Sequence, residues 1–207
     1  RRDGAFGIYA LQLLPKLKPL TNSDWLVAGP FKSYWSCEGG ENTSAALAKD
    51  LAETILPVDK VELDAVFTGL NGKKVRWSPK TDSSVGDLND LVVGMPIRTG
   101  SANSDINYAA TFIKSESDRS ALLHLATDWW GLAWLNGERL SSNINPKLKA
   151  DSGDADFTSM VPYQAILRLK KGVNILIVKQ HGGSLGSGMA AYISDAPDIK
   201  AAASPKD

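Results

Sequence analysis

Short alternations of apolar and polar residues, each bounded by a turn signal, fill most of this chain and constrain its fold more than any other feature. Successive side chains of a β-strand point to opposite faces of a sheet, so alternation with a period of two predicts a strand. Runs of this kind occupy residues 24–31, 61–67, 73–79, 105–115, 120–128, 131–141, 163–180 and 189–195. So many short strands with little helix predict an all-β fold, an antiparallel β-sandwich.

Glycine and asparagine mark the turns between these runs. Asn136-Gly137 predicts a type I′ hairpin turn, because both residue types tolerate the positive φ angles that this turn requires. Residues 69–72, Gly-Leu-Asn-Gly, predict a second hairpin. Lys171-Gly172 predicts a hairpin turn that joins two strands within residues 163–180, and we expect Asn174 to pin this hairpin by bonding nearby backbone.

Two segments show helical rather than strand spacing. Apolar residues over 6–20 recur at intervals that fit a helix of about three turns, bent or ended by Pro15. Residues 42–54 predict a short helix within a loop, with Asn42 or Thr43 as its N-cap. The chain therefore divides into a helical N-terminal arm (1–22), a sandwich domain (23–196) and a linker-like tail (197–207).

The charge balance narrows the class of ligand. Lys and Arg together number 23, as do Asp and Glu, so the formal net charge is zero. Proteins that bind nucleic acid or an anionic membrane surface carry a basic excess, so this balance favours a neutral ligand. The single cysteine, Cys37, excludes an internal disulfide and a cysteine zinc site. No apolar stretch approaches the roughly 18 residues of a membrane span, and the first residues do not read as a signal peptide.

Four spaced elements form a recognisable pattern. They are Trp25 before Gly29-Pro30-Phe31, a strand ending in Asp128, the run Trp134-Leu135-Asn136-Gly137, and Leu169, Gly172 and Asn174 ahead of Val178-Lys179. In this order they resemble the galactose-binding-like (jelly-roll) domains of large multidomain bacterial proteins, over residues 24–195. The resemblance implies a sugar-binding, spacer or accessory role and an extracytoplasmic location. That family commonly has a small polar turn after the aspartate, where this chain has Trp129-Trp130.

Trp129 and Trp130 are the leading candidates for ligand contact. Half of the chain's six tryptophans lie within residues 129–134. Because adjacent strand residues point to opposite sides, at most one of Trp129 and Trp130 can enter the core without a bulge. The other would be a platform on which the apolar face of a pyranose stacks, or a contact to the N-terminal arm or another domain. Trp134 shares a face with Leu132 and is expected to be packed.

Residues 34–42, a glycine-rich loop after the first strand, form a second candidate cluster. The cluster contains Tyr34, Trp35 and Glu41. If this loop and Trp129 share one end of the sandwich, they line an aromatic cleft in which Glu41 and Asp128 accept hydrogen bonds from a ligand. The alternative is a loop that closes the open end of the sandwich with aromatic side chains.

Two further groups give weaker signals. Lys179 and His181 are candidate donors to sugar hydroxyls, beside glycines that let backbone approach a ligand; the alternative is a plain strand connection. Asp151, Asp154 and Asp156 alternate in a loop as Ca²⁺ ligands do, and the alternative is a solvated acidic turn. His124 lies within a strand and is expected to be satisfied by its sheet.

The common catalytic motifs are absent from the sequence. It has no Gly-x-Ser-x-Gly elbow, P-loop, His-Glu-x-x-His or Rossmann glycine pattern, and only two histidines. We therefore expect a non-catalytic chain without a cofactor, for which structural calcium at residues 151–156 is only a candidate, and which belongs to a longer polypeptide with an enzyme domain. The leading hypothesis is a carbohydrate-binding module for a neutral glycan. The alternatives are a structural module whose aromatic patch docks on a neighbouring domain and a subunit of a cell-surface assembly.

Overall fold

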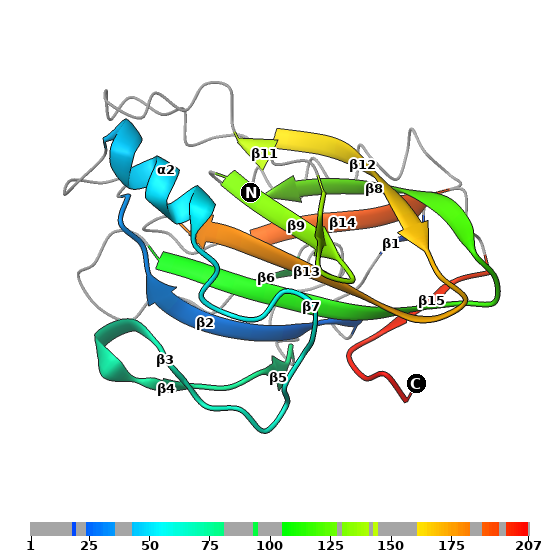
Figure 1. Ribbon diagram of the computed structural model, residues 1–207, viewed down its shortest axis with the longest axis horizontal. Helices are drawn as coiled ribbons and strands as arrows, with labels where there is room; N and C mark the ends of the chain where they lie inside the picture. Colours follow the sequence, from blue (N-terminus) through cyan, green and yellow to red (C-terminus); the bar gives the residue numbers. More distant parts are fainter. Residues whose placement is uncertain are drawn as a thin grey trace.

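The protein is an antiparallel β-sandwich. Its computed structural model describes residues 18–19, 24–35, 43–80, 93–94, 105–127, 130–140, 143–144, 161–182, 188–194 and 198–206. Every strand pairing within these residues is antiparallel. Two main sheets pack face to face (Figure 1), so the all-β sandwich predicted from the alternating runs is confirmed.

The two sheets, A and B, have the following strands. Sheet A runs β1 (Lys18–Pro19), β14 (Gly188–Ser194), β8 (Arg119–Thr127), β12 (Val161–Leu169), with β6 (Val93–Gly94) beside β14. Sheet B runs β10 (Glu138–Arg139), β9 (Trp130–Leu135), β13 (Gly172–Gly182), β7 (Asp105–Ser115), β2 (Leu26–Lys32), β5 (Ser78–Pro79), with β11 (Asn143–Ile144) beside β9 and β15 (Lys200–Ala202) beside β7. A separate hairpin pairs β3 (Phe67–Thr68) with β4 (Lys74–Val75).

The chain alternates between the sheets in its second half. Strands β7, β9, β13 and β15 belong to sheet B, and β8, β12 and β14, which come between them in the sequence, belong to sheet A. Each crossing therefore carries the chain over the rim of the sandwich, and strands that follow one another face each other across the core. This is the jelly-roll arrangement.

Sheet B is buried on both of its faces. The inner face packs against sheet A in a core that includes Trp25 and Leu123. The outer face packs beneath α2 (Ser44–Ala52) and the segment after it, in a second core that includes Trp77 and Trp130. Figure 1 shows α2 at the left, near the ends of the strands of this sheet. Strands β7 and β9 are consequently buried at almost every position, and Trp25 and Trp77 fill the core as predicted.

The helix and the two turns that were predicted from capping and turn residues are present in the structure. Helix α2 begins after Thr43, whose Oγ1 accepts a hydrogen bond from the Ala46 amide at 3.1 Å. The β9–β10 hairpin turns at Asn136 and Gly137 with φ angles of 52° and 83°. The Gly-Leu-Asn-Gly turn also forms, as a 3₁₀ segment η2 (Leu70–Gly72), but the strands on either side pair over only two residues each.

Three segments differ from the sequence-based expectations. Lys18–Pro19, placed in a helical arm, instead pair with β14 as a strand, while residues 1–17 and 20–22 lie outside the described parts. The tail expected to be a linker contains strand β15, and Ile199 before it is buried in the core. The turn at Lys171-Gly172 joins strands of different sheets, so it is a crossing rather than a hairpin.

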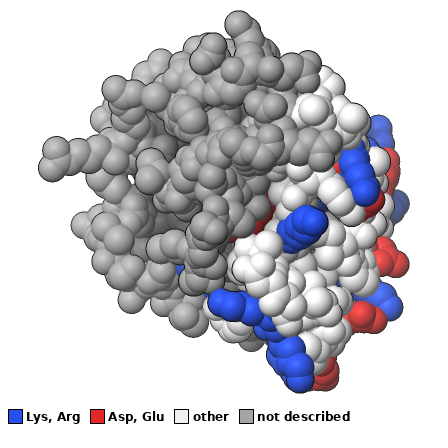
Figure 2. All heavy atoms as spheres, turned by 90° about the vertical axis from the view of Figure 1, so that its left-hand side faces the viewer, with Lys and Arg blue, Asp and Glu red and all other residues white. Residues whose placement is uncertain are grey.

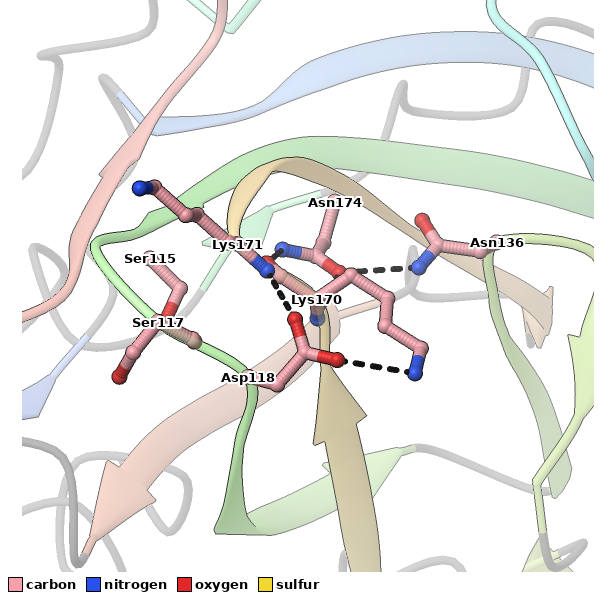
Figure 3. A network of polar contacts seen from close by, with 7 residues as sticks. All are labelled: Ser115, Ser117, Asp118, Asn136, Lys170, Lys171 and Asn174. Carbon is pink, nitrogen blue, oxygen red and sulfur yellow. Dashed lines mark hydrogen bonds and ion pairs between the residues drawn. The ribbon is translucent and has the colours of Figure 1, made fainter.

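Asn174 fixes that crossing (Figure 3). Its Oδ1 accepts from the Lys170 amide at 2.8 Å and from Asn136 Nδ2 at 2.9 Å. Its Nδ2 donates to the carbonyls of Lys170 (2.8 Å) and Ile113 (3.2 Å). Asp118, in the neighbouring crossing from β7 to β8, accepts from the Lys171 amide at 2.8 Å. The network therefore ties two crossings and the β9–β10 turn together at one end of the sandwich.

Candidate functional site

The ends of several sheet B strands meet at the opposite end of the sandwich. In the strand register, Gly182 at the end of β13 pairs with Asp105 at the start of β7, and Asp105 also pairs with Lys32 at the end of β2. Gln180 pairs with Gly131, near the start of β9. The segments 36–42, 128–129 and 183–187 continue from these ends and lie outside the described residues; they include three of the predicted contacts, Glu41, Asp128 and Trp129.

An aromatic cluster forms at this end between three of the predicted residues. The His181 ring lies 4.9 Å from the Trp35 ring and 5.5 Å from the Trp130 ring, measured between centroids. His181 Nε2 also lies 3.4 Å from the Trp35 carbonyl oxygen. The structure thus brings Trp35 and Trp130, 95 positions apart in the sequence, to one end of the molecule, as the cleft hypothesis requires.

These three side chains are too deeply buried to contact a ligand directly. Trp130 and His181 are 0% exposed and Trp35 is 2% exposed. Trp130 shares with Leu132 and Trp134 the outer face of β9, which lies under the layer that contains α2. Their rings therefore offer no open face on which a pyranose could stack. These three rings therefore fill the interior at this end of the sandwich. Trp35 and Trp130 do not form the walls of an open cleft, which was one of the two arrangements that the sequence suggested.

Lys179 is also enclosed, although the sequence suggested a ligand donor. Its side chain is 0% exposed, and Nζ donates to the carbonyls of Glu53 (2.7 Å) and Asp50. Nζ lies 5.5 Å from the centre of the Trp130 ring. Burial lowers the pKa of Lys179 to about 8. Its hydrogen-bonding capacity is directed at the end of α2 rather than outward.

Asp50 is a key residue that the sequence analysis did not single out. Its buried carboxylate accepts hydrogen bonds from Ser33 Oγ (2.5 Å), the Tyr34 amide (3.0 Å) and the Trp35 amide (2.9 Å). A signal was present, because Asp50 lies four positions after Ala46, on the apolar face of its helix. An acidic residue at such a position is expected to have specific partners.

Tyr34 is the predicted contact with the most accessible ring among those the structure describes. Its side chain is half-buried, and Lys49 Nζ lies 3.7 Å from the ring centre. One face of the ring therefore carries a cation–π contact. A ligand that stacks on Tyr34 must use the other face or displace Lys49.

The other predicted residues divide into two groups. Those outside the described parts are Glu41, Asp128, Trp129, Asp151, Asp154 and Asp156. His124 is satisfied within its sheet as expected, with Nε2 3.0 Å from Ser194 Oγ and Nδ1 3.1 Å from Gln164 Nε2. Within the described ranges, no group of three or more His, Cys, Asp or Glu side chains could hold a metal ion, and no helix is long and apolar enough to cross a membrane.

The charge on this end of the molecule is mixed. Figure 2 views it directly, and basic and acidic side chains lie interspersed on the part of the surface that the structure describes. This agrees with the zero net charge of the whole chain. Neither sign dominates the described border of the end, so its electrostatics suit a neutral ligand better than a polyanion.

Comparisons with known proteins give only distant matches. No family model and no curated protein matches the chain. A β-glucosidase from Kluyveromyces marxianus in complex with glucose is 16% identical over 83% of this chain and 15% of that chain, with a TM-score of 0.39. A PA14 sugar-binding domain from an RTX adhesin is 10% identical over 86% and 94%, with a TM-score of 0.42. A family 35 carbohydrate-binding module from Clostridium thermocellum is 12% identical over 51% and 88%, with a TM-score of 0.34. With TM-scores this low, the likeness assigns neither a family nor a ligand to this chain.

Proposed function

We propose that this chain is a non-catalytic carbohydrate-binding domain that holds a neutral glycan at the end of the sandwich where β2, β9 and β13 meet. The contacts would come from Trp129 as the stacking ring, with Asp128 and Glu41 as hydrogen-bond acceptors and Tyr34 at the border. The domain would act beside a catalytic domain of a longer, extracytoplasmic polypeptide. A weak site suffices there, because tethering raises the effective concentration of the ligand.

The burial of Trp130 is the observation that carries this proposal. Adjacent residues of a strand point to opposite sides, so the layer under α2 can accommodate only one of the two neighbouring indoles. Trp130 is that indole, with no exposed surface. Trp129 precedes β9 in the sequence, at the end of the sandwich, and we infer that it contacts a ligand there instead of entering the inner core between the two sheets. Trp35, His181 and Lys179 are buried and hydrogen-bonded at the described part of this end. A base of this kind would keep a binding surface in one shape.

The test is binding to neutral polysaccharides. Wild type, Trp129→Ala and Ile166→Ala would be compared by affinity electrophoresis on xylan, galactomannan, laminarin and pectic galactan, and by calorimetry on any polymer that retards the wild type. Ile166 is 59% exposed on β12 of the other sheet and is the control for removing an apolar side chain. Trp129→Ala should lower the affinity by about tenfold or more, since a stacking tryptophan is typically a dominant contact. Equal binding of all three would show that Trp129 is not the platform.

A docking role is the second candidate, and one observation favours it. Ile55, Leu63 and Val66, in the segment between α2 and β3, are 38%, 48% and 45% exposed. A contiguous group of exposed apolar side chains is typical of a contact surface, and the docking role assumes that these three form such a group. If no polysaccharide retards the wild type, and Leu63→Ser with Val66→Ser releases the domain from the rest of its polypeptide in limited proteolysis, an interdomain role would replace the glycan role.

A further inference from the structure

The C-terminal end of α2 is held by a side chain from the sheet beneath it. The last carbonyl groups of a helix have no partner within the helix, and the helix dipole makes this end favourable for a cation. Lys179 Nζ, on β13, donates to the carbonyl of Asp50 in the last turn and, at 2.7 Å, to that of Glu53 at the C-cap. One ammonium group therefore joins sheet B to two carbonyls at the end of α2.

Asp50 extends this connection to β2. Its backbone carbonyl accepts from Lys179, while its carboxylate accepts from the backbone amides of Tyr34 and Trp35. Ser33 Oγ donates to the same carboxylate at 2.5 Å. A continuous chain of hydrogen bonds thus runs from the middle of sheet B, through the last turns of α2, to the backbone from which segment 36–42 departs.

Stability is a poor explanation for a lysine in this position. An ammonium removed from water loses its hydration, and the two carbonyl hydrogen bonds offset only part of that loss. The lowered pKa of Lys179 agrees, because it means that the native environment disfavours the charged form. The charges of Asp50 and Glu53 act to raise the pKa and that of Arg139 to lower it. Tyr108, paired with Lys179 in the register, is un-ionised at neutral pH, since burial raises its pKa to about 12.

We propose that Lys179 is a positioning residue, which fixes α2 on sheet B and, through Asp50, fixes the start of segment 36–42. The inference deepens the proposed function and rests on it for its consequence, because that segment carries Glu41. A methionine of similar length could fill the same space without a charge. Lysine differs from methionine because it donates two hydrogen bonds to defined carbonyl groups at the end of the helix. It therefore fixes the position of α2 on sheet B without adding to the free energy of unfolding.

Hydrogen exchange followed by mass spectrometry tests this without any glycan. Lys179→Met is compared with wild type and with Lys114→Met, a lysine exposed on β7 of the same sheet. In Lys179→Met, amide protection over residues 44–53 and 33–35 should fall by roughly ten- to a hundredfold, the loss expected for hydrogen bonds to a charged group. Protection in β8 and β12 and the midpoint of urea unfolding should change little. Lys114→Met should match wild type throughout.

A second variant tests the other half of the connection. Asp50→Asn keeps the backbone carbonyl that accepts from Lys179 but weakens the acceptor for two amides. Protection should fall at residues 34–35 and persist at the C-terminal end of α2. Unchanged protection in α2 for Lys179→Met, or at residues 34–35 for Asp50→Asn, would overturn the proposal. Failure of Lys179→Met to fold would also overturn it, because the proposal gives Lys179 no net stabilising role.

Binding measurements on the same variants separate this inference from the proposed function. Where wild type binds a polysaccharide, Lys179→Met should lose affinity while its urea midpoint holds; intact affinity together with lost protection would show that the connection does not serve the site. Where wild type binds none, the proposed function fails, and the exchange data still report whether Lys179 fixes α2.

Discussion

At the scale of the residue, burial decides the role that each polar side chain takes. Lys179 and His181 resemble ligand donors in the sequence because they stand beside glycines at the end of a strand. In the structure both point into the layer between sheet B and α2, where neither is exposed. A lysine enclosed in this way loses its hydration, so its protonation becomes part of the free energy of folding.

The effect of Lys179 on the free energy of unfolding should therefore depend on pH. Its native pKa of about 8 lies below the ordinary value of 10.5, so between these values the unfolded state binds more protons than the native state. The cost of the buried charge is fully present below pH 8 and is relieved as pH rises towards 10.5. The free energy of unfolding of wild type minus that of Lys179→Met should rise by up to about 3 kcal/mol over this window.

Urea unfolding at several pH values from 7 to about 10 would measure the difference, and comparing the two proteins cancels the contributions of the tyrosines. Lys114→Met should run parallel to wild type over the whole range. A difference between wild type and Lys179→Met that is flat, or that falls with pH, would contradict the assignment.

At the scale of the element, local chemistry predicts what forms but not what it pairs with. Asn136-Gly137 specifies its turn through backbone conformation alone, and Thr43 specifies the start of α2 through one hydrogen bond. The turn at Lys171-Gly172 has equally clear signals, yet the strands on its two sides enter different sheets. Strand β15 was missed because its small residues show no apolar period, and its place depends on residues 112–114 of β7, which extend beyond the pairing of β7 with β2.

Gly137, in the β9–β10 turn, and Gly72, in the turn between β3 and β4, allow a matched test of steric crowding. Gly137 and Gly72 have similar φ angles of +83° and +74°, which strain any other residue. A Cβ at Gly137 would lie 2.9 Å from the Asp59 Cβ, whereas nothing lies within 4 Å of one at Gly72. Both alanine variants should lose about 1 kcal/mol from backbone strain, and Gly137→Ala should lose more because Asp59 must move. Urea midpoints measure both, and an equal or greater loss for Gly72→Ala would refute the steric argument.

At the scale of the whole molecule, the layer formed by α2 and the segment after it on the outer face of sheet B explains why the site was only partly predictable. Strand alternation correctly placed Trp134 and Leu132 on one face, and the strand ends bring Trp35, Trp130 and His181 together. Alternation cannot say whether a face meets solvent. That depends on α2 and the residues after it packing across sheet B, which no local pattern specifies. The sequence predicted that Trp35 and Trp130 share one end, but it placed His181 in a separate group and left open whether the rings line a cleft or close the end.

We expect the crossings at the opposite end to make the two sheets unfold as one cooperative unit, and Asn174 allows this to be measured. Its fully buried amide bonds the β12–β13 crossing, strand β7 and the β9–β10 turn. Asn174→Ala leaves several of these groups buried without a partner, so it should lower the free energy of unfolding by about 2 to 4 kcal/mol. The lost bonds hold the crossing from β12 against β7 and the β9–β10 turn. Protection from hydrogen exchange should therefore fall in β7, β12 and β13 together, unlike the local loss expected for Lys179→Met. Asn71→Gly, which removes an exposed amide and keeps a positive φ, is the control and should change neither measurement. A loss confined to the residues around 174 would show instead that each sheet holds its own stability and that the crossing only links them.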